Sequence, residues 1–208
     1  MNKYLTELIG TLFLVMGAML GGAVGASLAL MVMIYAGGHV SGAHYNPAVT
    51  LSVWMRGKIE MKDAVMYWIF QFAGAIIAAL LVMYVFSVEG SGECKATEGW
   101  GTRAIVAELV GTFALAYVVL NVATAKGTSG NSFYGIAIGG TVLAMATAVG
   151  SFSGGAFNPA VAIGLCVQHS FCWDHVWVYF VGPLGGGALA AIVFSFINPD
   201  SFYEHLNL

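Results

Sequence analysis

The sequence contains one short segment twice, and the two copies constrain the fold more than any other feature. They are SGAHYNPAVTL at residues 41–51 and SGGAFNPAVAI at residues 153–163. In each copy an Asn-Pro-Ala triplet begins a short apolar run and follows small residues that disfavour a helix. Asparagine is a good N-cap and proline fits the first helical position, so each triplet predicts a helix start. We therefore expect two short helices, over about 46–55 and 158–167.

The composition places the chain in a lipid bilayer. Of its 208 residues 59% are hydrophobic and only 8% are charged, and the mean hydropathy is +0.85. Soluble domains have far more charged residues, so these values indicate an integral membrane protein. The net charge of −3, with no basic stripe, argues against a nucleic-acid partner.

Six apolar runs are long enough to cross a membrane. They cover about residues 4–20, 23–39, 64–87, 104–124, 133–150 and 175–197. The first run is not a cleaved signal, because TELIGTLF at 6–13 reappears as AELVGTFA at 107–114. The two short helices cannot cross ~30 Å of hydrocarbon at ~1.5 Å per residue, so they reach only halfway. The predicted fold is an all-α membrane protein with six transmembrane helices and two re-entrant half-helices.

The spacing of the two copies indicates an internal repeat. Asn46 and Asn158 are 112 residues apart (158 minus 46), and small residues of the helix after each triplet share this spacing. Each repeat has three spanning helices, and an odd number inverts the second copy relative to the first. We expect a single transmembrane channel domain over 1–208, with repeats at about 1–88 and 103–198, whose half-helices meet near the midplane.

Basic residues near helix ends predict the orientation. With the N-terminus inside, five of them are cytoplasmic and two are external; the five are Lys3, Arg56, Lys58, Lys62 and Lys126, and the two are Lys95 and Arg103. This asymmetry favours cytoplasmic N- and C-termini in a multi-pass protein of the cell (plasma or inner) membrane.

Non-helical backbone at membrane depth predicts a water-filled path. Such backbone is tolerated only where it is buried in protein or lines a cavity. Two positive half-helix ends would also converge at the centre and repel cations, protons included. Carbonyl groups at 42–45 and 154–157 would supply acceptors along the path. This pattern suits passive conduction of small neutral molecules.

These features together resemble the aquaporins, or major intrinsic proteins, of bacterial or archaeal type. The resemblance spans essentially the whole chain: it rests on the doubled NPA, a doubled E-x-x-G-T, GHVSGAHYNPAVT at 38–50 and the inverted repeat. It implies an hourglass pore in each subunit, water or small neutral solutes as cargo, and a homotetramer. It implies no cofactor and no metal. An enzyme is also disfavoured, since no catalytic constellation has workable spacing.

The resemblance also implies roles for individual residues. The central constriction would comprise the two triplets, which are Asn46, Pro47, Ala48, Asn158, Pro159 and Ala160. The pore would be lined by His44, Gly42, Ala43, Gly154 and Ala156. Glu7 and Glu108 would brace the re-entrant loops through hydrogen bonds to their backbone.

The chain departs from the family pattern at the outer selectivity filter. Its four positions would be Ala26, Ala146, Gly155 and Val161, with valine where the family commonly has arginine. The predicted filter is wide, apolar and uncharged unless an aromatic residue enters it. The candidates for that are Tyr117, Phe152 and Tyr134.

Water is the expected main solute, and three alternatives stay open. A wide filter also fits a glycerol, urea, ammonia or peroxide facilitator. Inverted repeats with broken helices occur in coupled transporters too, although His44 alone would be a poor ion relay. A non-conducting structural membrane protein of the same fold is the third alternative. Cys94, Cys166 and Cys172 lack metal-site spacing, which predicts free thiols, although Cys94 and Cys172 both fall on the outer side.

Overall fold

The computed structural model describes residues 1–92 and 99–199, and this part of the chain is helical without strands. The α-helices are α1 (Asn2–Ser41), α2 (Pro47–Met55), α3 (Met61–Tyr84), α4 (Trp100–Thr124), α5 (Tyr134–Ser153), α6 (Pro159–Val167) and α7 (Val178–Ile197). A short 3₁₀ turn, η1 (Lys126–Thr128), follows α4, and a second one, η2 (Trp173–His175), precedes α7. The predicted all-α class is confirmed, and α2 and α6 are the two expected half-helices.

Helix α1 contains the first two predicted spans. Its helical geometry breaks at Gly22, where φ is 56° and ψ is −144°, a conformation that glycine adopts readily. The two halves fold back on each other: a Cβ built on Gly25 would lie only 2.3 Å from the carbonyl oxygen of Gly17. In the described part of the chain, five helices are long and apolar enough to cross a membrane. Because α1 folds back at Gly22, its two halves count as two spans, which gives six.

Glycines set the closest helix contacts in both repeats. A Cβ on Gly74 of α3 would lie 2.4 Å from the Leu8 carbonyl of α1, and one on Gly186 of α7 would lie 2.4 Å from the Leu109 carbonyl of α4. Small residues allow membrane helices to approach closely. The small-residue faces of α3 and α7, which share the 112-residue spacing, therefore pack in equivalent ways. Helix α3 packs on α1, and α7 packs on α4.

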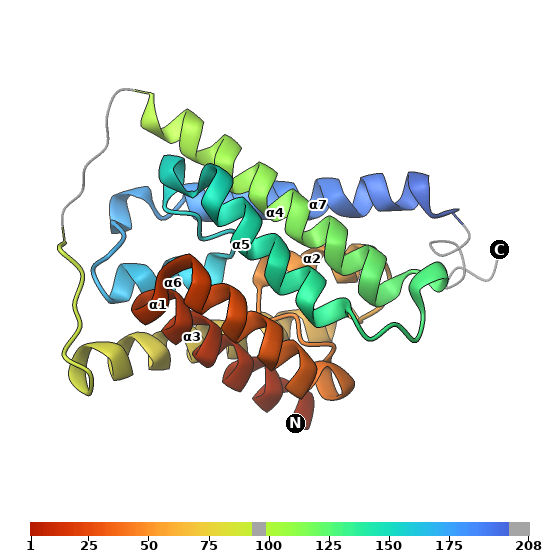
Figure 1. Ribbon diagram of the computed structural model, residues 1–208, viewed down its shortest axis with the longest axis horizontal. Coiled ribbons are helices and arrows are strands. Elements are labelled where there is room, and N and C mark those ends of the chain that lie inside the picture. The colour runs from red at the N-terminus through yellow and green to blue at the C-terminus, as the bar shows by residue number, and fades with distance from the viewer. Residues whose placement is uncertain (93–98, 200–208) are drawn as a thin grey trace.

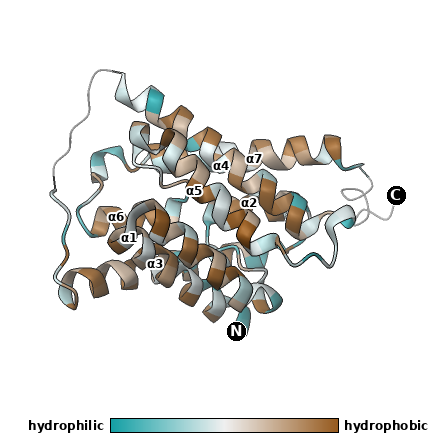
Figure 2. Cartoon of the chain, viewed as in Figure 1, coloured by the Kyte–Doolittle hydropathy of each residue, from teal (hydrophilic) through white to brown (hydrophobic). Residues whose placement is uncertain are grey.

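The half-helices interlock the two repeats. Figure 1 shows α1 and α3 on one side of the molecule and α4 and α7 on the other, with α2 and α6 between them. Helix α2 packs against α7, and α6 packs against α3, so each half-helix contacts the last helix of the other repeat. Apolar residues follow the long helices, as Figure 2 shows, and many large ones are exposed on the outside. These surfaces fit a multi-pass protein surrounded by lipid.

Candidate functional site

The two triplets form helix starts with the same geometry. Asn46 and Asn158 have extended backbones and cap α2 and α6, with proline at the first helical position. The Oδ1 of Asn46 accepts from the backbone N–H of Ala48 at 2.8 Å, and that of Asn158 accepts from Ala160 at 2.9 Å. Each cap satisfies a backbone donor that the helix leaves unpaired.

The two asparagines also bond across the midplane. The Nδ2 of Asn46 donates to the carbonyl of Phe157 at 2.9 Å, and the Nδ2 of Asn158 donates to the carbonyl of Tyr45 at 2.9 Å. A side-chain amide nitrogen carries two hydrogens, so one N–H of each asparagine remains. Both asparagines line the central cavity described below, so these remaining N–H groups are available to donate hydrogen bonds to molecules inside it.

Glu7 holds the first re-entrant loop. Its carboxylate is fully buried, and its Oε1 accepts from Ser41 Oγ at 2.7 Å and from the backbone N–H of His44 at 3.0 Å. Its Oε2 accepts from the backbone N–H of Tyr45 at 2.7 Å and from Gln71 Nε2 at 2.8 Å. Four donors thus surround one carboxylate behind the loop.

Glu108 has the corresponding position in the second repeat. Its Oε1 accepts from Ser153 Oγ at 2.7 Å and from the backbone N–H of Ala156 at 3.0 Å. Its Oε2 accepts from the backbone N–H of Phe157 at 2.6 Å. Because Pro183 stands where the first repeat has Gln71, no glutamine amide reaches this carboxylate at the equivalent position, and the two braces differ.

A central cavity of about 180 Å³ runs between the half-helices. All four predicted filter positions line it, namely Ala26, Ala146, Gly155 and Val161. The predicted pore-lining residues Ala43, His44, Gly154 and Ala156 line it as well. The proline and alanine of each triplet do not line the cavity, because they are buried against neighbouring helices. The packing is close: a Cβ built on Gly187 of α7 would lie only 2.5 Å from the Ala48 carbonyl oxygen. Within the triplets the asparagines alone face the cavity.

A second cavity of about 780 Å³ lies toward the ends of α1 and α4. Gly42, predicted to line the pore, is found here, together with His39, Lys58 and Lys126. Five residues line both cavities: Ile34, Ala43, His44, Val119 and Ile138. These shared residues mark the place where the two cavities meet.

The family model for "Major intrinsic protein" matches residues 6–194. The chain belongs to the major intrinsic protein family. Aquaporin TIP1-2 from Zea mays is 40% identical over 174 residues, which cover 82% of this chain and 68% of that protein. Aquaporin TIP1-2 from Musa acuminata is 41% identical over 180 residues, covering 83% and 71% respectively. Probable aquaporin TIP2-2 from Arabidopsis thaliana is 39% identical over 183 residues, covering 86% and 72%.

The fold of this major intrinsic protein is also that of a solved structure. The aquaglyceroporin from Plasmodium falciparum superposes with a TM-score of 0.72, over 96% of this chain and 98% of that one. The two sequences are 19% identical, so the likeness concerns the fold alone. It agrees with the six spans and two half-helices expected from the doubled segment.

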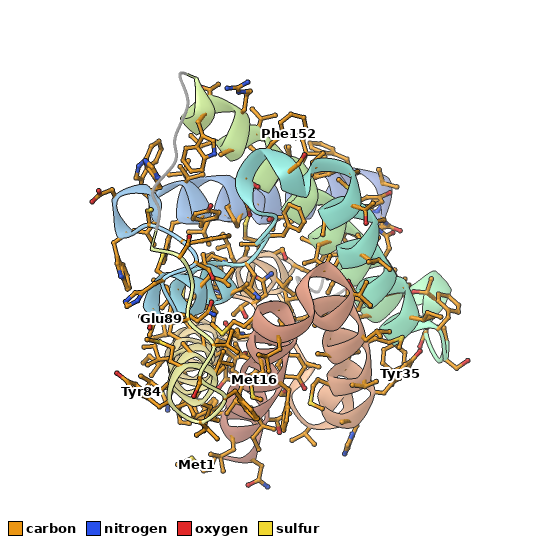
Figure 3. The ribbon with its side chains drawn as sticks, turned by 60° about the vertical axis from the view of Figure 1, so that its left-hand side comes forward. Met1, Met16, Tyr35, Tyr84, Glu89 and Phe152 are labelled. Atoms are coloured by element: carbon orange, nitrogen blue, oxygen red, sulfur yellow. The ribbon has the colours of Figure 1, made fainter. Side chains whose placement is uncertain are left out.

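No aromatic residue from the described part of this family member replaces the missing filter side chains. No Phe, Tyr or Trp there lines the central cavity. Phe152 is half-exposed at the C-terminal end of α5 (Figure 3), Tyr134 lines the second cavity, and Tyr117 stacks on Phe113. The idea that one of these three rings enters the filter is therefore wrong.

Several residues around the pore of this major intrinsic protein were not expected from sequence. Tyr45 and Phe157 have positive φ values of 51° and 48°, which turn their carbonyls toward the opposite asparagine. Gln71 and Thr50 are buried polar residues in apolar helices, and Gln71 bonds to both Glu7 and Thr50. An isolated polar residue inside a membrane helix was the available signal for Gln71.

The prediction of free thiols is wrong at one cysteine. Cys172 is disulfide-bonded, whereas the buried Cys166 is free. Cys94 lies outside the described residues. Sequence spacing excludes metal sites but does not show which cysteines are close in space, so the disulfide could not be predicted.

Proposed function

We propose that this protein is a passive channel that conducts water through the membrane and excludes ions. The observation that carries the proposal is the pair of half-helices whose caps, Asn46 and Asn158, bond reciprocally across a central cavity. The names of the relatives, which are aquaporins, support the same function. A channel of this kind needs no cofactor and no catalytic residue, in line with the expectation that the chain is not an enzyme.

Ion exclusion follows from the charges near the pore centre. The N-termini of α2 and α6 converge there, and each helix end carries a partial positive charge. The only buried carboxylates behind the described loops, Glu7 and Glu108, each accept at least three hydrogen bonds and line neither cavity. A cation would lose its hydration without gaining an anionic partner.

A second solute class is favoured by the outer end of the pore. Ala26, Ala146, Gly155 and Val161 present neither a large side chain nor a charge. Such an opening admits molecules larger than water, so glycerol, urea, ammonia or peroxide are the proposed additional solutes. The same residues provide no side-chain donor to replace lost hydration, and this favours water as the main solute.

The proposal extends to assembly and placement. We assign residues 1–208 to one channel domain, which forms a homotetramer in the cell membrane with both termini cytoplasmic. The excess of basic residues on the same side of the membrane as the N-terminus supports this orientation. The valine at position 161 supports an unusual outer filter. The three plant relatives do not support the bacterial or archaeal type that the sequence pattern suggested.

Osmotic shrinkage of liposomes tests the proposed function. Purified protein should speed shrinkage with a low activation energy. Empty liposomes and an Ala146→Trp variant, whose indole fills the cavity at the filter, should not show this acceleration. Flux that depends on a proton or sodium gradient would instead support a coupled transporter. A folded protein without any acceleration would indicate a structural role and would contradict the channel.

A further inference from the structure

Two places along this pore are candidates for the step that selects solutes, namely the four filter positions and the junction of the two cavities. The filter positions are two alanines, a glycine and a valine, and all four line the central cavity. The junction is where the central cavity meets the larger second cavity, at the residues that line both. The larger side chains that line both cavities are Ile34, His44, Val119 and Ile138. These four residues are called the neck below.

We propose that the neck selects solutes in this channel, and that His44 presents an Nε2–H donor to it. This inference rests on the proposed channel function and adds the position and chemistry of its selective step. Three neck residues are branched aliphatics, so they limit solute size without forming hydrogen bonds. His44 is then the one hydrogen-bonding side chain of the neck, and its orientation decides what the neck offers.

Two contacts hold the imidazole of His44 in place. Its Nδ1 lies 3.1 Å from the hydroxyl oxygen of Thr50 on α2. Its ring packs edge-on against Tyr67 of α3, with ring centres 5.1 Å apart and planes at 70°. The residue is almost completely buried, so the ring has little freedom to turn. The opposite nitrogen, Nε2, is left for the neck.

The hydrogen bonds of Gln71 decide which nitrogen of His44 carries the proton. The amide nitrogen of Gln71 is always a donor, and it lies 2.8 Å from Glu7 Oε2 and 3.0 Å from Thr50 Oγ1. Its two hydrogens are thereby used, and the hydroxyl of Thr50 acts as an acceptor toward Gln71. The remaining contact of that hydroxyl is His44 Nδ1.

The hydroxyl hydrogen of Thr50 therefore points at His44. Thr50 is fully buried, and a buried hydroxyl hydrogen without an acceptor is unfavourable. Donation to Nδ1 requires that Nδ1 be unprotonated, and the neutral ring then carries its hydrogen on Nε2. Glu7, Gln71 and Thr50 form a chain of hydrogen bonds that ends in one defined tautomer. Gln71 and Thr50 are thus positioning residues.

This arrangement gives the neck a specific preference. A water molecule can accept from Nε2–H and donate to a loop carbonyl while it contacts aliphatic side chains elsewhere. A polyol needs more room and several partners at once, and the neck offers one donor. The neck therefore favours water over the larger solutes that the outer filter also admits.

A matched pair of truncations tests the position of the selective step. Ile138→Ala enlarges the neck, and Val161→Ala enlarges the central cavity at the outer filter by a similar change. In liposomes we expect Ile138→Ala to raise the ratio of glycerol to water permeability several-fold and Val161→Ala to leave it unchanged. The reverse pattern would overturn the proposal with the channel function intact. No water conduction by the unmodified protein would overturn both.

The tautomer has its own test, which does not depend on flux. Nitrogen-15 NMR of histidine-labelled protein in liposomes separates protonated from unprotonated ring nitrogens, and a His44→Asn variant assigns the signal. We expect a single Nε2–H form in the unmodified protein and in Thr50→Ser, which keeps the hydroxyl. Thr50→Val should give mixed tautomers and a changed glycerol-to-water ratio. A proton on Nδ1 in the unmodified protein would overturn this part of the proposal.

Discussion

The side-chain nitrogen of Asn46 lies 2.9 Å from the carbonyl oxygen of Phe157, the residue that precedes the second pore asparagine. The reverse bond, from Asn158 to the carbonyl of Tyr45, has the same length. Each asparagine thus caps its own half-helix and holds the loop of the other repeat. The two repeats fix each other's position at the pore centre, and the remaining amide hydrogens have a defined direction.

Asn158→Asp should let cations and protons leak through the pore. The aspartate keeps an oxygen for the cap on Ala160, but it cannot donate to the Tyr45 carbonyl, and it adds a negative charge between two positive helix ends. Proton and sodium flux into liposomes, measured with internal dyes, checks this, with Asn46→Asp as the symmetric variant. Unchanged leaks alongside normal water flow would contradict the electrostatic account.

Val161→Arg should lower the passage of larger solutes more than that of water. Position 161 lines the central cavity, so a long cationic side chain there would narrow the outer filter and add donors for water. Glycerol, urea and water permeabilities from the same liposomes provide the comparison, with Val161→Leu as an uncharged control. A constant glycerol-to-water ratio would mean that side chains at this position do not enter the path.

Glu7→Gln should destabilise the protein more than Glu108→Gln. If the new NH₂ group takes the place of Oε2, it faces two donors in the first repeat, Tyr45 N–H and Gln71 Nε2, but one in the second, Phe157 N–H. Each buried donor left without an acceptor costs about 1–3 kcal/mol. Thermal unfolding in detergent measures the difference. Equal losses for the two variants would show that the extra glutamine contact contributes nothing.

Gly10→Ala and Gly111→Ala should both prevent the re-entrant loops from packing. A Cβ on Gly10 would lie 2.0 Å from the Tyr45 ring, and one on Gly111 would lie 2.2 Å from the Phe157 ring. Those rings belong to the residues whose carbonyls hold the opposite asparagines. The yield of folded protein and its water permeability should fall for both variants. Gly140→Ala is the control, because no atom lies within 4 Å of its added Cβ. A similar loss in the control would attribute the effect to helix composition instead.

The sequence by itself determined the spans, the two half-helices and the inverted repeat. These depend on local properties, since apolar run length decides what crosses the bilayer and an Asn-Pro pair decides where a half-helix starts. The break at Gly22 lies between the first two predicted spans, 4–20 and 23–39, whose bounds leave room only for a tight connection.

Tertiary structure alone decided which distant residues bond to one another around the pore. The bond from Asn46 to Phe157 joins positions 111 apart, and the chain from Glu7 through Gln71 to His44 crosses three helical elements. The bonded Cys172 and the position of Phe152 outside the central cavity likewise depend on how the helices pack. The family resemblance placed the filter positions. The neck exists only because distant helices bring Ile34, Val119 and Ile138 together with His44.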